Sequence, residues 1–161
     1  MTATISKSKR SNWTKSDIPN LDGKTAFITG ANSGLGYYTA KALAEKNAHV
    51  LLACRSLEKA NAAIDKLKSL NPAGKFTPIE LDLSDLNNVS EIGSKISSEF
   101  ENLDLLINNA GIMHPPKTLS KQGFEIQFAV NHLAHMLLTC LLYTSDAADE
   151  GLGVDLGGRR I

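Results

Sequence analysis

The chain has 161 residues, enough for about one domain, and its 42% hydrophobic and 21% charged residues are those of an ordinary globular protein. A formal net charge of +0 argues against a nucleic-acid partner, and no apolar run is long enough to span a bilayer. Two cysteines form no disulfide framework, and residues 1–10 lack the apolar core of a secretory signal, so a cytoplasmic protein is expected.

Strand and helix patterns alternate along residues 21–139, after an irregular polar arm at residues 1–20. Short apolar runs predict buried strands, and apolar residues three or four apart predict helices. Strands are expected at 25–29, 48–54, 76–81 and 103–107. Helices are expected at 35–46, at 57–67, behind an N-cap at Ser84, and at 122–139.

This alternation predicts an α/β fold of the Rossmann type, a doubly wound parallel sheet with helices on both faces. In the common doubly wound order the strands run 3-2-1-4, which places the third strand at an edge. Pro78 falls on that strand. Because a proline cannot donate to the hydrogen-bond ladder, it belongs on a sheet edge, and its position supports the predicted order.

Residues 140–161 differ in sequence character from the rest of the chain. The run from Cys140 to Asp149 resembles a translated sequencing adapter, and Val154 to Ile161 resembles a primer of the same library in the same reading frame. Residues 150–153 would be mostly the variable index between them. We therefore predict a non-native, disordered tail at 140–161, with a native Gly-rich flexible tail as the alternative.

A glycine-rich turn, Thr29-Gly-Ala-Asn-Ser-Gly-Leu-Gly36, joins the first strand to the first helix. Such a turn lets the backbone approach a pyrophosphate and directs the positive end of a helix at it. The spacing Gly-x-x-x-Gly-x-Gly is neither that of long dehydrogenases nor that of a phosphate-binding loop ending in Gly-Lys-Ser/Thr. The predicted cofactor-binding residues of this loop are Gly30, Asn32, Ser33, Gly34, Leu35 and Gly36.

The end of the second strand indicates which dinucleotide binds. A carboxylate there would hold the adenosine ribose of NAD, but the sequence reads Ala53-Cys-Arg-Ser56. Arg55 offers a planar donor fork for a phosphate, and Lys59 follows one helical turn later. NADP is therefore predicted in preference to NAD, with a solvated surface charge as the alternative reading of Arg55.

The loop spacing resembles that of the short-chain dehydrogenase/reductase family, and three further motifs follow in the family's order. Asn108-Asn-Ala-Gly111 is similar to the second family signature, Leu81-Asp-Leu83 to the adenine-contacting segment, and Asn131 to the helix asparagine. The resemblance covers residues 22–139 and is strongest to the retinol dehydrogenase and protochlorophyllide reductase-like branch. It implies cofactor contacts from Asp82, Leu83, Asn109, Ala110 and Gly111.

The resemblance implies hydride transfer between NADP(H) and a hydroxyl or carbonyl of a small apolar substrate. In the family a tyrosine is the general acid/base, a lysine lowers its pKa, a serine steadies the substrate oxygen and an asparagine holds a water. Only the asparagine, Asn131, has a match here. We therefore expect a cofactor-binding fragment of a longer enzyme, and the resemblance implies a homodimer for that parent.

Two other readings stay open at this stage. A non-catalytic NADP-binding module is the main alternative, since no serine and Tyr-x-x-x-Lys pair follows Asn131. A nucleotide-sugar epimerase is disfavoured, because such enzymes usually carry Gly-x-x-Gly-x-x-Gly and Ser33 occupies the middle position.

Three further patterns are interpreted as structural. Tyr37 and Lys41 satisfy Tyr-x-x-x-Lys by spacing, but they lie at the phosphate end of the loop helix and are expected on its surface. Tyr143 falls in the predicted tail without a matching lysine. His132 and His135 are expected to share a helix face, but without a third ligand they predict packing contacts and no metal site.

Overall fold

The computed structural model describes residues 13–70 and 74–149, with side chains described as far as Leu142. Within these residues one parallel sheet has the order β3-β2-β1-β4. Its strands are β1 (Thr25–Thr29), β2 (His49–Cys54), β3 (Lys75–Glu80) and β4 (Leu105–Ile107). The predicted Rossmann-type α/β fold and its strand order are confirmed, and Pro78 lies on the edge strand, paired in register with Leu52.

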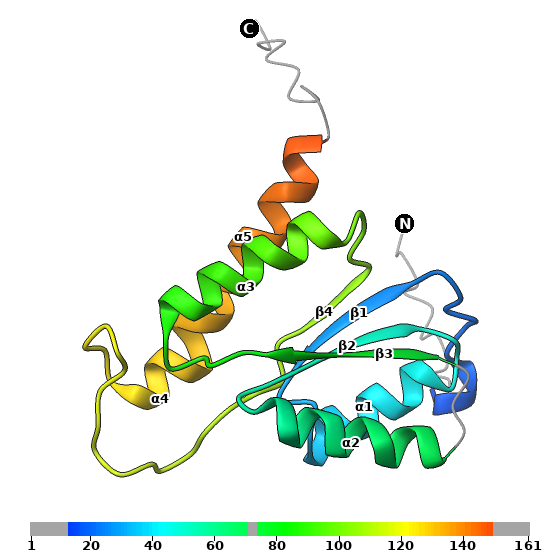
Figure 1. The fold of residues 1–161 in the computed structure, drawn as a ribbon, viewed down its shortest axis with the longest axis horizontal. Helices are drawn as coiled ribbons and strands as arrows, with labels where there is room; N and C mark the ends of the chain where they lie inside the picture. Colours follow the sequence, from blue (N-terminus) through cyan, green and yellow to red (C-terminus); the bar gives the residue numbers. More distant parts are fainter. Residues whose placement is uncertain (1–12, 71–73, 150–161) are drawn as a thin grey trace, which may run out of the picture.

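Helices cover both faces of the sheet (Figure 1). On one face lie α1 (Gly34–Ala44) and α2 (Leu57–Ser69), and on the other α3 (Leu86–Glu99) packs against α5 (Ala134–Asp149). The single turn α4 (Ile126–Phe128) and the π-helical turn η2 (Ala129–Leu133) lead directly into α5, and a 3-10 turn, η1 (Lys15–Asp17), precedes β1. None of the helices in the described ranges is long and apolar enough to cross a membrane.

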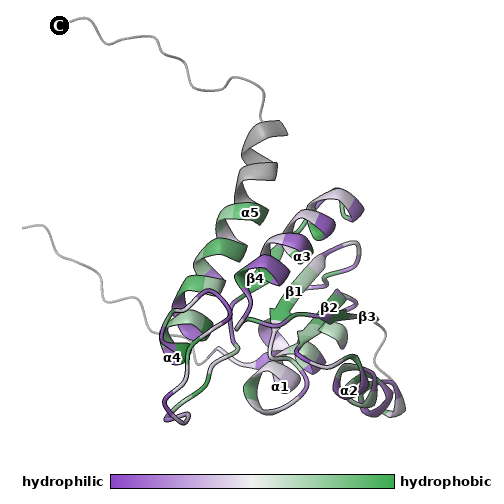
Figure 2. Ribbon diagram, turned by 60° about the vertical axis from the view of Figure 1, so that its left-hand side comes forward, coloured by the Kyte–Doolittle hydropathy of each residue, from purple (hydrophilic) through white to green (hydrophobic). Residues whose placement is uncertain are grey.

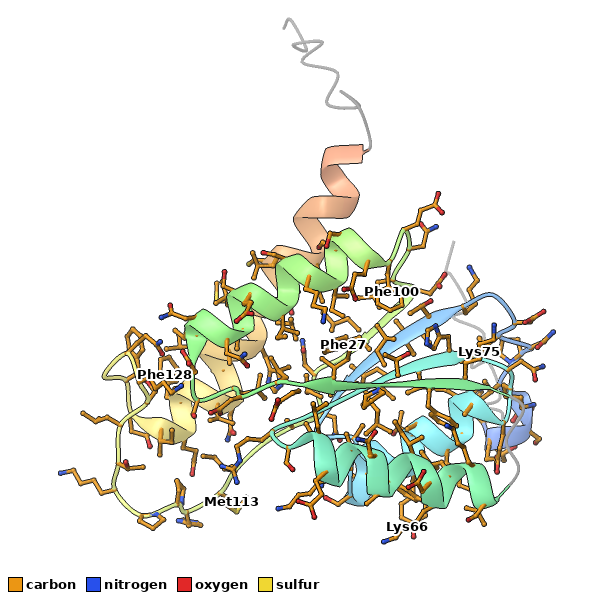
Figure 3. The ribbon with its side chains drawn as sticks, in the orientation of Figure 1. Phe27, Lys66, Lys75, Phe100, Met113 and Phe128 are labelled. Atoms are coloured by element: carbon orange, nitrogen blue, oxygen red, sulfur yellow. The ribbon has the colours of Figure 1, made fainter. Side chains whose placement is uncertain are left out.

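Alternating side chains on the two central strands build one core on each face of the sheet. Ile28 points toward α1 and α2, where it joins Leu67, and both are fully buried. Phe27 points the other way, between the sheet and α3 (Figure 3), and packs with Leu138 of α5. Figure 2 shows β1 in the hydrophobic colour, flanked by helices that also carry hydrophilic residues. The two cores hold the carboxyl ends of the strands in fixed positions.

Two predicted helix starts are wrong. The N-cap of α3 is Asp85, not Ser84, because the Asp85 carboxylate accepts a hydrogen bond from the Asn87 N–H at 3.1 Å. The last helical segment begins at Ile126 rather than Gln122, with Glu125 as its N-cap. The side chain of Gln122 is bonded instead to the start of α3, so this residue belongs to the preceding loop.

The predicted disorder of residues 140–149 is also wrong, because α5 continues as a helix to Asp149. Leu142 is buried in the core between α5 and the sheet. Leu141 lies so close to α3 that a Cβ placed on Gly93 would be 2.9 Å from its Cδ1 atom. Apolar packing therefore extends the helix past Thr139. Residues 150–161 and 1–12, which the sequence assigns to the tail and the arm, lie outside the described residues.

Candidate functional site

A hollow of about 520 Å³ lies at the carboxyl ends of the parallel strands, where doubly wound folds bind their ligands. The ends of β1 and β2 form one wall, together with the segments that follow β3 and β4. The loop and helix from Pro115 to Val130 form the other wall. The predicted cofactor-binding residues that line the hollow are Gly30, Asn32, Arg55, Asp82, Leu83, Ala110 and Gly111.

The remaining predicted residues surround the hollow without lining it. Ser33, Gly34 and Leu35 are exposed at the start of α1, and Lys59 is exposed on the first turn of α2. Gly36 and Asn109 are packed together next to Gly30. Asn131 contacts Ile112, which is itself part of the lining.

Two glycines of the loop are required by close approach of the neighbouring backbone. Gly30 has a φ of +66°, and a Cβ placed on it would lie 2.9 Å from the Cα of Ala110. On Gly36 a Cβ would lie 2.5 Å from the Nδ2 atom of Asn109 and 2.6 Å from the carbonyl oxygen of Gly30. The absence of side chains here lets the turn after β4 come into contact with the turn after β1.

The hydroxyl of Thr29, which is only 1% exposed, fixes the turn after β4. The N–H groups of Asn109 and Ala110 both donate to Thr29 Oγ1, at 2.9 and 3.0 Å. The Asn109 amide nitrogen donates to the Thr29 carbonyl oxygen at 2.9 Å. Thr29 was not among the predicted site residues, although a polar residue that ends a buried apolar run directly before the glycine loop is a detectable signal.

Asn131 lies in the π-helical turn η2, in which the Ala134 N–H donates to the carbonyl of Ala129 five residues earlier. Its side-chain amide pairs with the backbone of Ile112: the Ile112 N–H donates to Oδ1 and Nδ2 donates to the Ile112 carbonyl, both at 2.8 Å. Single π-turns within helices are frequent at functional sites. This pairing holds η2 against the segment that follows Gly111.

The two helix histidines do not share a face, which corrects the sequence prediction. His132 is exposed and stacks on the ring of Phe128 at 5.2 Å. His135 is 7% exposed, and its Nε2 lies 2.9 Å from Thr29 Oγ1. Burial lowers the pKa of His135, so its imidazole is held in the neutral form. Across the residues that the structure describes, no three His, Cys, Asp or Glu side chains converge as a metal site would need.

Tyr37 of α1, which was expected on the helix surface, is half-buried against the core on that face of the sheet. Lys41, also half-buried, lies 3.9 Å from a carboxylate oxygen of Glu45. The side chain of Tyr143 lies outside the described residues.

An ion pair joins the two walls of the hollow at their outer end. Lys121 donates to Asp85 Oδ2 at 2.7 Å, and Gln122 Nε2 donates to Asp85 Oδ1 at 2.9 Å. Gln122 Oε1 in turn accepts from the Leu86 N–H at 3.0 Å. The hydrogen bond from Lys121, followed by that from Gln122, lowers the pKa of Asp85 from 3.8 to about 2. The loop that carries the second wall is therefore attached to the first turn of α3.

Arg55 stands at the rim, between this hollow and a second one of about 550 Å³ beside β3 and α3. The nearby carboxylate of Asp82 accepts hydrogen bonds from the N–H and hydroxyl of Ser84, at 2.9 and 2.7 Å. The lining of the first hollow thus presents an exposed guanidinium beyond β2, while its one carboxylate is engaged by its own turn.

The short chain dehydrogenase family model matches residues 24–152. Human retinol dehydrogenase 13 is 44% identical over 128 residues, which cover 80% of this chain and 38% of that protein. This chain therefore spans less than half the length of the curated relatives it matches.

Two solved structures show the same arrangement of elements. A crystal structure of an uncharacterized protein from Mycobacterium Paratuberculosis is 42% identical with a TM-score of 0.72, covering 84% of this chain and 47% of that one. A metagenomic short-chain oxidoreductase in complex with NADP is 27% identical with a TM-score of 0.68, covering 81% of this chain and 60% of that one.

Proposed function

The chain belongs to the short chain dehydrogenase family, and from that premise we propose that residues 21–139 are the NADP-binding half-domain of a longer oxidoreductase. The parent would transfer hydride between NADP(H) and a hydroxyl or carbonyl of a small apolar substrate. One observation carries this proposal: residues from four separate strand ends, each predicted to contact a dinucleotide, line a single hollow at the carboxyl edge of the sheet.

The residues present fit a dinucleotide. The backbone around Gly30, which a Cβ would obstruct, offers close approach to a pyrophosphate at the N-terminal end of α1. Asp82 and Leu83 would border the adenine, and Ala110 and Gly111 would border the part of the cofactor nearest η2. When bound, the nicotinamide would supply the hydride, and the chain's own residues would bind and orient it.

We propose NADP rather than NAD because of the charge at the rim. The Arg55 guanidinium can donate two parallel hydrogen bonds to the additional phosphate of NADP, and Lys59 adds a second positive charge one turn later. Asp82, the carboxylate of the lining, is bonded to Ser84 and follows β3 rather than β2. The NADP found in the metagenomic relative is consistent with this choice.

We propose that this chain binds the cofactor but does not turn over substrate by itself. Asn131 is the one match to the family's catalytic set, and no serine with a Tyr-x-x-x-Lys pair follows it in the sequence. The same observation supports the second candidate, a non-catalytic NADP-binding module. Sequencing of the source transcript past Thr139, by a method without adapters, separates the two and tests whether residues 140–161 are an adapter-derived tail.

Titration of the chain with NADPH and with NADH, followed by nicotinamide fluorescence, tests cofactor binding directly. We expect NADPH to bind with a Kd of about 1–100 μM and at least tenfold more tightly than NADH. No binding of either nucleotide up to about 1 mM would overturn the proposal. Retinol and retinal are suitable first substrates for the full-length parent, because the relative is named a retinol dehydrogenase.

We also propose that the parent associates with a second copy through the exposed face of the last helical segment. Phe128, His132 and Met136 are spaced four residues apart, and all three are exposed, Phe128 and Met136 by 51% and 58%. Light scattering of the full-length parent tests this association.

We propose a cytoplasmic location for the parent, because the two cysteines suit a reducing compartment.

A further inference from the structure

Hydrogen bonds form a closed ring around Ala110 and Gly111, at the end of the hollow next to η2. The ring runs from the Thr29 hydroxyl to the Ala110 N–H, along the backbone to Ile112, and across to the Asn131 side chain. His135 closes it, since its Nδ1 lies 3.3 Å from the carbonyl oxygen of Asn131 and its Nε2 lies 2.9 Å from Thr29 Oγ1.

The partners of His135 determine its tautomer. A carbonyl oxygen can only accept, so the Nδ1 atom that faces Asn131 must carry the proton. A neutral imidazole then has a bare Nε2 that accepts from the Thr29 hydroxyl. The hydroxyl accepts the N–H groups of Asn109 and Ala110, and its own proton has two possible acceptors, of which His135 Nε2 at 2.9 Å is nearer than the Ile107 carbonyl oxygen at 3.5 Å. The hydroxyl of Thr29, the amide of Asn131 and both ring nitrogens of His135 then each have a partner.

From this geometry we infer that His135 is a positioning residue, which, as the neutral Nδ1–H tautomer, couples Thr29 to Asn131 and fixes the Ala110–Gly111 segment of the hollow. Burial lowers the pKa of His135 and maintains its neutral form. The consequence for cofactor binding rests on the proposed function. Because Ala110 and Gly111 follow β4 while Arg55 follows β2, on the other side of β1, His135 acts on the nicotinamide end and leaves the adenosine end unaffected.

The tautomer can be measured in the unliganded chain without any substitution. Two-dimensional ¹H–¹⁵N spectra correlate the imidazole nitrogens with the carbon-bound protons of the imidazole. They distinguish a protonated Nδ1 from a protonated Nε2. We expect a neutral His135 with a bare Nε2 at pH 7. A protonated Nε2 would overturn the inference, and this result holds whether or not the chain binds NADPH.

Binding of two ligands then distinguishes a positioning role of His135 from a merely structural one. NADPH has a nicotinamide and 2′-phospho-ADP-ribose has none, so a merely structural role of His135 would weaken both equally. For His135→Phe we expect about tenfold weaker NADPH binding and less than about twofold change for 2′-phospho-ADP-ribose. His135→Gln, whose amide can still accept from Thr29, should recover part of the loss. His132→Phe, on the exposed face of the same segment, is the matched control and should bind both ligands normally.

The possible failures point to different causes. If the wild-type chain binds neither ligand, the proposed function is contradicted. The tautomer measurement then tests separately whether His135 couples Thr29 to Asn131. Equal weakening of both ligands in the His135 variants, or weakening of neither, contradicts the positioning role. If His135→Phe does not fold, the comparison is made with His135→Gln, which keeps one of the two hydrogen bonds.

Discussion

The two ends of the hollow differ in what forms them, backbone at one end and side chains at the other. At the β1–β2 end the backbone forms the wall: Ala31 is fully buried, and Gly30 and Gly36 admit no side chain. At the η2 end side chains hold the wall, because the exposed Asn131 is fixed by its amide pair with Ile112 and by His135. The first end should therefore fail when volume is added, and the second when a hydrogen bond is removed.

Gly36→Ala tests the backbone end and should have the largest effect. The new Cβ would lie 2.5 Å from the Nδ2 atom of Asn109 in the turn after β4, so the two turns must separate. We expect NADPH binding to be lost and the free energy of unfolding to fall by about 3 kcal/mol. Nicotinamide fluorescence and urea denaturation measure these two quantities.

Gly34→Ala is the matched control for this substitution. Gly34 has a φ of +56° but no atom within 4 Å of an added Cβ, so only backbone strain of about 1 kcal/mol is expected. Equal decreases in the free energy of unfolding for the two substitutions would contradict the view that close approach of the backbone, rather than glycine conformation, defines this end of the hollow.

Thr29→Val tests the junction between the two ends. The substitution keeps the shape of the side chain but leaves the part-buried N–H group of Ala110 without its acceptor, and that of Asn109 with the Ile107 carbonyl oxygen alone. We expect the free energy of unfolding to fall by about 2–4 kcal/mol in urea denaturation. Thr39→Val is the control, because the Thr39 hydroxyl bonds only within its own helix, to the Leu35 carbonyl, and should cost less than about 0.5 kcal/mol.

Arg55→Ala probes the rim, where no steric constraint operates. Loss of the guanidinium should weaken NADPH binding about tenfold and leave NADH binding unchanged, because NADH lacks the additional phosphate. Lys66→Ala, on the same helix as Lys59 but two turns further on and exposed (Figure 3), should change neither. A parallel loss of NADPH and NADH binding would show that Arg55 does not contact that phosphate.

Local sequence patterns carried enough information to predict the fold. The alternation of apolar runs gave the parallel sheet, and Pro78 supported the strand order. The glycine spacing likewise placed Gly30 correctly at the end of β1, since a strand–turn–helix signal lies within a few residues. These features depend on neighbours along the chain.

The parts that could not be predicted depend on partners far apart in sequence. Thr29 and His135 are separated by 106 positions, and Asp85 and Lys121 by 36, so no local pattern joins them. The helix through residues 140–149 was missed for a related reason. Leu141 and Leu142 pack against α3 and the sheet, whereas the resemblance of their segment to a translated adapter indicated a tail.

Asp85→Asn should have the smallest effect, because it weakens an attachment outside the hollow's lining. Asparagine is an equally good N-cap, so the substitution removes the ion pair with Lys121 and the hydrogen bond within it. We expect about threefold weaker NADPH binding, since the loop wall is held less firmly. Asp104→Asn, which removes an ion pair with Lys24 instead, should leave NADPH binding unchanged.

The pH dependence gives the same test without a substitution. The pKa of Asp85 is about 2 in the folded chain and near 3.8 without its partners, so the folded state favours the ionised carboxylate. Its contribution to stability is therefore complete above about pH 4 and disappears as the pH falls toward 2. In acid denaturation Asp85→Asn should flatten this part of the profile relative to wild type. An unchanged acid limb would mean that the ion pair between Lys121 and Asp85 does not hold the second wall in solution.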